Sequence, residues 1–115
     1  MLYNGSRRKK VLLMSLTGKQ KSFLKAKAHD MQPIVQVGKN LVTESVIDTV
    51  FKALEARELI KVSVLQNCLA EPKEVANAIA KQAEAQIVQV IGRVIILYKK
   101  STKPANHIIT NKIPR

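Results

Sequence analysis

The sequence is poor in cysteine, in aromatic residues and in acidic residues, and it has no long apolar run. Cys68 is the only cysteine among the 115 residues, which excludes an internal disulfide and a cysteine-based zinc cluster. The longest apolar runs, such as residues 94–98, are far shorter than the roughly 20 residues of a membrane-spanning helix. Since 46% of the residues are apolar, we expect one folded domain with a core and no membrane partner.

Aromatic side chains are too few for a platform on which nucleic-acid bases stack. Two of them lie on the apolar faces of expected helices. The four are Tyr3, Phe23, Phe51 and Tyr98.

The residues that usually carry catalysis or bind metals are also sparse. His29 is expected at a helix end, where an imidazole can interact with free carbonyls, and His107 lies far away near the C-terminus. With Cys68 isolated as well, the sequence offers no metal set and no pair of nucleophile and base. We therefore expect neither an enzyme nor a protein with a metal or another cofactor.

Basic residues outnumber acidic ones by 20 to 8, and the excess lies at the two ends of the chain. Residues 1–30 carry eight bases and one acid, residues 31–98 carry seven of each, and residues 99–115 carry five bases and no acid. A neutral folded centre with basic flanks favours a polyanion as the partner. The alternative is that the flanks only keep the protein in solution.

This pattern divides the chain into a basic flexible arm (1–15), a folded domain (16–100) and a basic tail (101–115). The apolar run in the arm is shorter than a signal peptide requires, so we expect a cytoplasmic protein. A mitochondrial presequence is a minor alternative. Translation from Met14 is a second one, which leaves open whether residues 1–13 belong to the native product.

The first predicted helix starts after Thr17, because Gln20 three residues later completes a capping-box pattern. Asp30 and Pro33 mark its end. Leu24 and its apolar neighbours form one face, and the rest of the helix surface is basic. The basic residues are Lys19, Lys21, Lys25 and Lys27.

Alternating and helical periodicities predict the remaining elements. A helix beginning at Thr43 carries an apolar stripe that includes Phe51, and we expect the whole stripe to be buried. Gly92 and Arg93 fit a two-residue type II′ hairpin turn. The elements are a strand at 34–37, the helix after Thr43, a strand at 59–65, a helix from Pro72, and strands at 87–91 and 94–98. The expected fold is a single α/β domain of order α-β-α-β-α-β-β with a mixed four-stranded sheet.

The turn between the first strand and the second helix is a candidate phosphate site. Gly38, Lys39 and Asn40 come directly before a helix N-terminus, where backbone N–H groups and the helix dipole favour an anion. Gly38 is expected to have a positive φ or to allow close approach of a phosphate. An ordinary turn glycine is the alternative explanation.

Three stretches together carry a resemblance to a known family: "LTGKQKSFLKAKAHDMQPIVQVGKN", "ELIKV" and "VQVIGRVIILYK". From about Leu16 to Lys100 the chain resembles the YhbY-like CRM family, the chloroplast RNA splicing and ribosome maturation domain. The resemblance implies helices against a mixed four-stranded sheet, similar to the C-terminal domain of translation initiation factor three. It also implies RNA binding, and its single-domain bacterial members are associated with precursors of the large ribosomal subunit.

The family's signature loop is a GxxG, which aligns with Gly38, Lys39, Asn40 and Leu41. Leu41 stands where the family has its second glycine. Its side chain either obstructs the approach of RNA or packs into the core. Asn40 tolerates a left-handed conformation, so we expect the turn to form in either case.

The resulting hypothesis is a monomeric, non-enzymatic protein that binds ribosomal RNA in large (50S) subunit precursors and assists assembly. The alternatives are a cofactor for splicing of structured introns and a general polyanion or membrane-surface binder; a DNA-binding module lacks a helix-turn-helix signal. The candidate RNA-binding residues are Lys19, Lys21, Lys25, Lys27, Gly38, Lys39, Asn40, Leu41, Arg93, Lys99 and Lys100.

Overall fold

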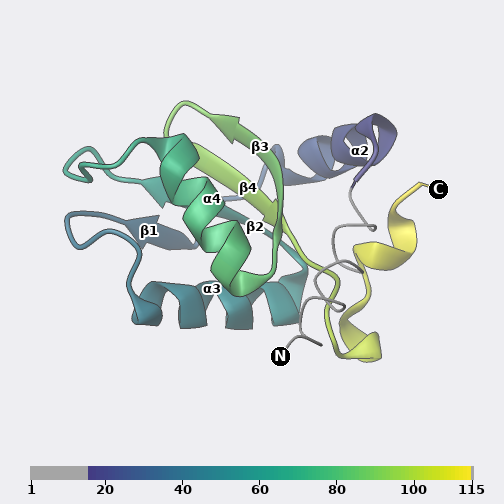
Figure 1. Ribbon diagram of the computed structural model, residues 1–115. Helices are drawn as coiled ribbons and strands as arrows, with labels where there is room; N and C mark the ends of the chain where they lie inside the picture. The colour runs from purple at the N-terminus through teal and green to yellow at the C-terminus, as the bar shows by residue number, and fades with distance from the viewer. Residues whose placement is uncertain (1–15, 115) are drawn as a thin grey trace, which may run out of the picture.

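The computed structural model describes residues 16–114, and the predicted order of elements is confirmed within them (Figure 1). The expected basic arm at 1–15 lies outside the described residues. The elements are α2 (Gly18–Ala28), β1 (Val35–Val37), α3 (Glu44–Arg57), β2 (Leu59–Val64), α4 (Pro72–Ala83), β3 (Gln86–Ile91), β4 (Val94–Tyr98), η1 (Pro104–Asn106) and η2 (Thr110–Lys112).

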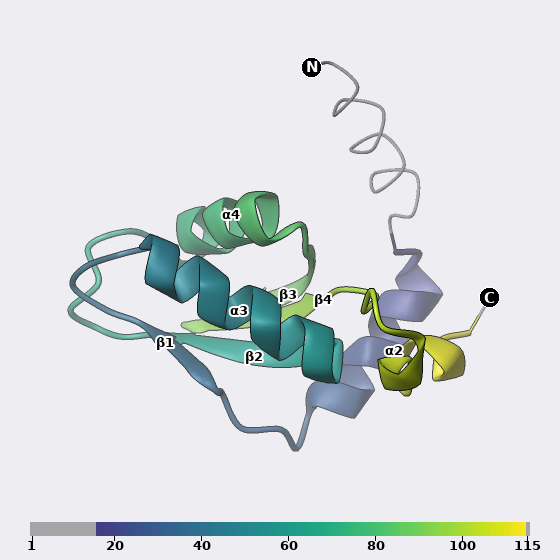
Figure 2. The ribbon, with the colours of Figure 1, turned by 90° about the horizontal axis from the view of Figure 1, so that it is seen from below.

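The four strands form one mixed sheet, as predicted, in the order β1-β2-β4-β3. β1 and β2 are parallel, and β4 is antiparallel to both of its neighbours. α3 connects β1 to β2 and α4 connects β2 to β3, so both connections cross the sheet in the same direction. Such crossovers are nearly always right-handed, which places both helices on one face of the sheet. Figure 2 shows them there, with α2 on the opposite face.

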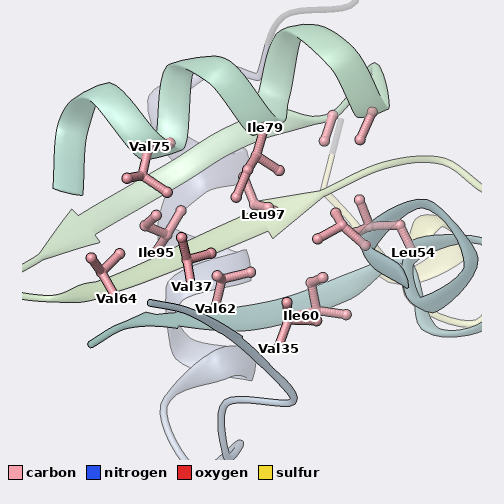
Figure 3. Close-up of a cluster of buried hydrophobic side chains, with 14 of the residues drawn as sticks. Val35, Val37, Leu54, Ile60, Val62, Val64, Val75, Ile79, Ile95 and Leu97 are labelled. Atoms are coloured by element: carbon pink, nitrogen blue, oxygen red, sulfur yellow. The ribbon is translucent and has the colours of Figure 1, made fainter. Parts of the chain in front are cut away.

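Each face of the sheet has its own apolar core. The larger core lies under α3 and α4, where Leu54 and Ile79 pack against alternate strand residues such as Ile60 and Val62 (Figure 3). The smaller core lies under α2, where Leu24 and Ala28 pack on Leu59, Val88, Ile96 and Tyr98. The two faces are therefore covered by helices of very different sequence.

The local signals in the sequence account for the starts of the helices and for the hairpin. The Gln20 backbone N–H donates to Thr17 Oγ1 at 3.1 Å, and the Thr17 N–H donates to Gln20 Oε1 at 2.9 Å, which confirms the capping box. Pro72 is the first residue of α4, and Gly92 has a φ of 56°, as its hairpin position requires.

The expectation that the whole apolar stripe of α3 is buried was wrong for Phe51. Val50 and Leu54 are fully buried, but Phe51 remains 36% exposed. The Lys99 Nζ lies 4.9 Å from the centroid of its ring, so a cation covers part of the ring in place of the core.

Residues 99–114, which include most of the expected basic tail, pack against α3 and α2. Glu58 at the end of α3 is fully buried and accepts hydrogen bonds from the Ser101 N–H at 2.8 Å and the Thr110 N–H at 2.9 Å. At the far end of the segment, Gln20 Nε2 of α2 donates to the Pro114 carbonyl at 3.1 Å. The segment thus connects the end of α3 to the start of α2. Figure 1 shows it beside α2.

The surroundings of the buried Glu58 carboxyl group favour its charged form. Burial by itself raises the pKa of Glu58, but the hydrogen bonds from Thr110 and Ser101, together with the nearby His107, outweigh it and hold this pKa below the usual value. The surrounding N–H and O–H groups donate hydrogen bonds to this carboxylate, and such bonds are stronger when the acceptor is charged.

Candidate nucleic-acid interface

The sheet separates the acidic residues from most of the lysines. Seven of the eight acids lie within α3 or α4 or at their caps, so they are on one face of the sheet. The remaining acid is Asp30, two residues beyond the end of α2. An anionic partner therefore meets less repulsion on the α2 face. The seven acids are Glu44, Asp48, Glu55, Glu58, Glu71, Glu74 and Glu84.

The four predicted lysines of α2 form two pairs along the helix. The amino-terminal pair is Lys19 and Lys21, and the carboxyl-terminal pair is Lys25 and Lys27. Three of them are exposed and Lys21 is half-buried. The amino-terminal pair stands at the end of the helix where the helix dipole disfavours positive charge, and the first turn of α2 contains no acid to offset it. The pair does not stabilise the helix, which favours a role in binding.

The loop from Gly38 to Leu41 is a tight turn. The Leu41 N–H donates to the Gly38 carbonyl at 3.0 Å, which closes the turn across Lys39 and Asn40. Lys39 and Asn40 are exposed, so the turn offers a cation at the edge of the sheet. The turn forms, as expected from the sequence.

The left-handed residue of this turn is Leu41, with a φ of 58°, whereas neither Gly38 nor Asn40 has a positive φ. The positive φ considered for Gly38 was therefore wrong, and the turn does not use the left-handed conformation that Asn40 tolerates. In a type I turn the two central residues have negative φ values, and glycine is favoured at the fourth position. Leu41 occupies that position and is 41% exposed, so it takes the strained backbone without being a core residue.

Neighbouring side chains leave little room for a side chain at Gly38. A Cβ atom at Gly38 would lie 3.2 Å from Asn67 Oδ1 and 3.3 Å from Leu65 Cδ1. Both neighbours belong to the connection between β2 and α4. This connection lies beside β1, because the Leu65 N–H donates to the Val37 carbonyl at 2.8 Å. Asn67 was not predicted at this site, and no local pattern in the sequence marks it.

Arg93 lies at the same end of the sheet. Its Nε donates to the Val64 carbonyl at 3.0 Å and its Nη2 donates to the Leu65 carbonyl at 2.9 Å, so the side chain fixes the end of β2. The guanidinium has five N–H donors and remains exposed, which leaves its charge near the Gly38 turn. The structure therefore brings together Gly38, Lys39, Asn40, Leu41 and Arg93.

The remaining candidates, Lys99 and Lys100, follow β4 at the opposite end from Arg93. Lys99 is only 9% exposed and its Nζ lies 2.5 Å from Glu55 Oε2, on the α3 side of the sheet. Lys100 is exposed. Lys99 is thus engaged within the fold and is separated from both the turn and the α2 lysines.

Glu55 has a strongly perturbed pKa. Burial raises it, but the hydrogen bonds from Lys99 and Thr102 and the charge of Lys99 together lower the pKa of Glu55 to about 2. Glu55 and Lys99 are therefore a charged pair that holds the C-terminal segment on α3.

Two further features bear on the kind of site. Within residues 16–114, no group of three or more His, Cys, Asp or Glu side chains is placed to hold a metal ion. None of the described helices is both long enough and apolar enough to cross a membrane.

The fold and the charge distribution define an α/β domain with a cationic helix on one face of a mixed sheet and a glycine turn at the sheet edge. The chain belongs to the CRS1 / YhbY (CRM) domain family, whose model matches residues 16–99. The resemblance seen in the sequence is thereby confirmed. Most of the C-terminal segment lies beyond the matched residues.

Known relatives match about three quarters of the chain. It is 57% identical over 86 residues to the "Probable RNA-binding protein YqeI" of Bacillus subtilis, covering 75% of this chain and 90% of the relative. An "RNA-binding protein" of Haemophilus influenzae is 39% identical over 89 residues, with 77% and 90% covered. The solution structure of the protein SAV1595 from Staphylococcus aureus is similar, with a TM-score of 0.67 and 44% identity over 77% of this chain and 93% of that one.

Proposed function

We propose that this protein binds RNA, and that its target is ribosomal RNA in precursors of the large ribosomal subunit, whose assembly it assists in the cytoplasm as a monomer. The observation that carries the proposal is the separation of charge by the sheet, with seven of the eight acids on the α3 and α4 face. The names of the relatives from Bacillus subtilis and Haemophilus influenzae support RNA as the partner.

The α2 lysines and the Gly38 turn contact phosphates in this proposal. Phosphate contacts orient a protein on nucleic acid and carry no sequence information themselves. The described aromatic side chains are poorly placed to stack on bases, since Tyr98 is buried, Phe51 lies on the acidic face and Phe23 packs partly into the smaller core. Recognition therefore depends on the shape of a folded RNA, and ribosomal RNA is the most abundant RNA of that kind.

Sedimentation of cell extracts through a density gradient at low salt tests the ribosomal target. We expect the protein in the fractions of large-subunit precursors, and crosslinks to ribosomal RNA in those fractions. A protein that stays at the top of the gradient, or that sediments only with membranes, would contradict the proposal. Crosslinks confined to structured introns would instead support the splicing alternative.

A matched pair of variants separates a specific face from general positive charge. One variant changes the four α2 lysines to glutamine, and the control changes four exposed bases of α3 and α4, so each loses four charges. The first should leave the precursor fractions and the second should stay. Equal losses would show that net charge alone determines binding. The four control positions are Lys52, Arg57, Lys73 and Lys81.

A further inference from the structure

Within residues 16–114, α2 covers only one end of the sheet face on which it packs. α2 packs over the end of the sheet formed by Leu59, Val88, Ile96 and Tyr98. Figure 2 shows α2 under one end of the sheet, and within residues 16–114 no other helix lies under the end near the turn between β1 and α3. The uncovered part lies between α2 and the Gly38 turn.

The strand register places one residue of each strand in a row across this uncovered part. Gln36 of β1 pairs with Ser63 of β2, Ser63 pairs with Val94 of β4, and Val94 pairs with Ile91 of β3. We call these four residues the open sheet row. Because side chains alternate along a strand and Val62 and Val64 point into the α3 and α4 core, the row points to the α2 side.

The open sheet row is accessible and uncharged. Gln36 is exposed, Ile91 is 55% exposed, and Ser63 and Val94 are partly exposed. The Gln36 amide and the Ser63 hydroxyl can each donate and accept hydrogen bonds. Two of the four positions are thus suited to polar contacts and two to apolar contacts.

Cations lie on both sides of this row. Lys39 follows Gln36 by three residues, and Arg93 lies in the hairpin that joins Ile91 to Val94. On the other side is α2 with its two lysine pairs. Lys61, two residues before Ser63 on the same face, donates to the His29 carbonyl at the end of α2 at 3.2 Å. An uncharged row between two positive borders matches an uncharged groove between two phosphate strands.

We propose that the open sheet row binds the minor-groove edge of a double-stranded RNA, with one phosphate strand on the α2 lysines and the other on Lys39 and Arg93. This inference rests on the proposed function and specifies the form of RNA bound. The minor groove of an RNA helix is wide and shallow and displays 2′-hydroxyl groups, which suit a flat surface with hydrogen-bonding side chains. Single-stranded RNA fits less well, because Phe23, which packs partly into the smaller core with Lys27 Nζ 5.8 Å from its ring centroid, does not form a stacking platform.

Binding to three synthetic probes of one sequence tests the inference. The probes are an RNA duplex of roughly 20 base pairs, a DNA duplex of the same sequence and one strand of the RNA alone. The duplex is longer than the ~16 base pairs that a double-stranded RNA-binding domain spans. The wild-type protein should bind the RNA duplex most tightly. Tighter binding of the single strand, or equal binding of the two duplexes, would overturn the inference.

The double substitution Gln36→Ala and Ser63→Ala isolates the contribution of the row. It should weaken binding to the RNA duplex by roughly tenfold, the effect of losing one or two hydrogen bonds, and leave binding to the DNA duplex unchanged. The salt dependence of binding should also stay unchanged, because no phosphate contact is lost. Wild-type affinity of this variant for the RNA duplex would refute the role of the row.

Two isosteric substitutions provide a matched test of position. Gln36→Glu and Gln82→Glu each add one negative charge at an exposed glutamine, the first in the row and the second on α4. Gln36→Glu should weaken binding to the RNA duplex at least tenfold, and Gln82→Glu less than twofold. Equal effects would overturn the inference while leaving RNA binding itself intact, whereas no binding to any RNA by the wild type would overturn the proposed function.

Discussion

The left-handed backbone of Leu41 predicts an unusual order of stability among variants at this position. For an L-residue this conformation costs roughly 1–2 kcal/mol, and glycine escapes the cost because it has no Cβ. Glycine in turn loses about 0.4–1 kcal/mol through the greater entropy of its unfolded chain. Leu41→Gly should therefore be more stable than Leu41→Ala by about 1 kcal/mol, although alanine is normally the more stable of the two.

Comparison with the wild type adds the loss of the leucine side chain. Leu41 is 41% exposed, so a little more than half of the side chain is removed from water. Full burial of a leucine is worth about 1.5–3 kcal/mol, which makes the loss here roughly 1–2 kcal/mol. The gain from the relaxed backbone offsets most of this loss in Leu41→Gly, so its free energy of unfolding should stay within about 1 kcal/mol of the wild type. A core change such as Leu54→Ala should cost about 2–5 kcal/mol.

Urea unfolding of both Leu41 variants measures this order directly. Asn40→Gly and Asn40→Ala serve as the control, because Asn40 lies in the same turn and has no positive φ. At Asn40 the alanine variant should be at least as stable as the glycine variant. If alanine is also the more stable substitution at position 41, Leu41 is not left-handed in solution and the explanation of the turn fails. RNA affinity gives a second result, since Leu41→Gly should bind more tightly if the leucine side chain holds the phosphate away.

Three further predictions concern the α2 lysines, the Gly38 turn and the C-terminal segment. Glutamine at the amino-terminal lysine pair should raise the melting temperature slightly and glutamine at the carboxyl-terminal pair should lower it, because the helix dipole favours cations only at the C-terminal end. Both variants should bind RNA less tightly. Melting temperatures that change in the reverse order would contradict this reasoning. Lys39→Ala should reduce the slope of log affinity against log salt by roughly 0.7–0.9 and leave the melting temperature unchanged. Gly38→Val should leave this slope unaltered but lower the free energy of unfolding by roughly 1–3 kcal/mol, because the new side chain contacts the loop between β2 and α4. If Gly38→Val binds RNA as tightly as the wild type, the turn is not part of the site. The pKa of Glu55 is lowered to about 2, so its contribution to stability is complete above pH 4.5 and is lost as the pH falls towards 2. The difference in stability between wild type and Glu55→Gln should therefore shrink over this range, by up to roughly 1.4 kcal/mol per pH unit, and a constant difference in acid melts would exclude the proposed role of Glu55.

The elements with local signals could be predicted from the sequence. The capping box of Thr17 and Gln20, the proline at the start of α4 and the glycine of the hairpin all act within a few residues. The alternation of Ile60, Val62 and Val64 along β2 is a signal of the same kind, and all three residues face the larger core. Such features can be inferred without a structure, because their energetics involve only neighbours in the sequence.

The features that escaped prediction depend on distant residues. Lys99 was expected at the RNA surface, but its partner Glu55 precedes it by 44 positions and no pattern joins the two. Glu58 takes a left-handed conformation at the end of α3, where glycine is the usual residue, and its buried carboxylate is satisfied by residues 43 and 52 positions away. The packing of the C-terminal segment therefore had no local signal.

The candidate site was predicted in part for the same reason. The residues of the Gly38 turn and the α2 lysines stand out by type and spacing. The open sheet row becomes visible only through the register of the strands, and Asn67 only through its approach to Gly38. Gln36 and Ser63 are ordinary polar residues of amphipathic strands. Their place in the proposed site depends on the neighbouring strands that align them in one row and on the position of α2, which leaves this row uncovered.

The separation of charge follows from the topology of the fold. The sequence concentrates acids between Glu44 and Glu84, which by itself does not place them on one face. The two crossovers that contain these residues run in the same direction, from β1 to β2 and from β2 to β3, past β4. A shared right-handed sense then requires α3 and α4, with their acids, to lie on the same side of the sheet. α2 precedes the first strand and is free of this constraint, so the chain can place its lysine-rich helix on the opposite face, where the part of the sheet that α2 leaves open can meet an RNA.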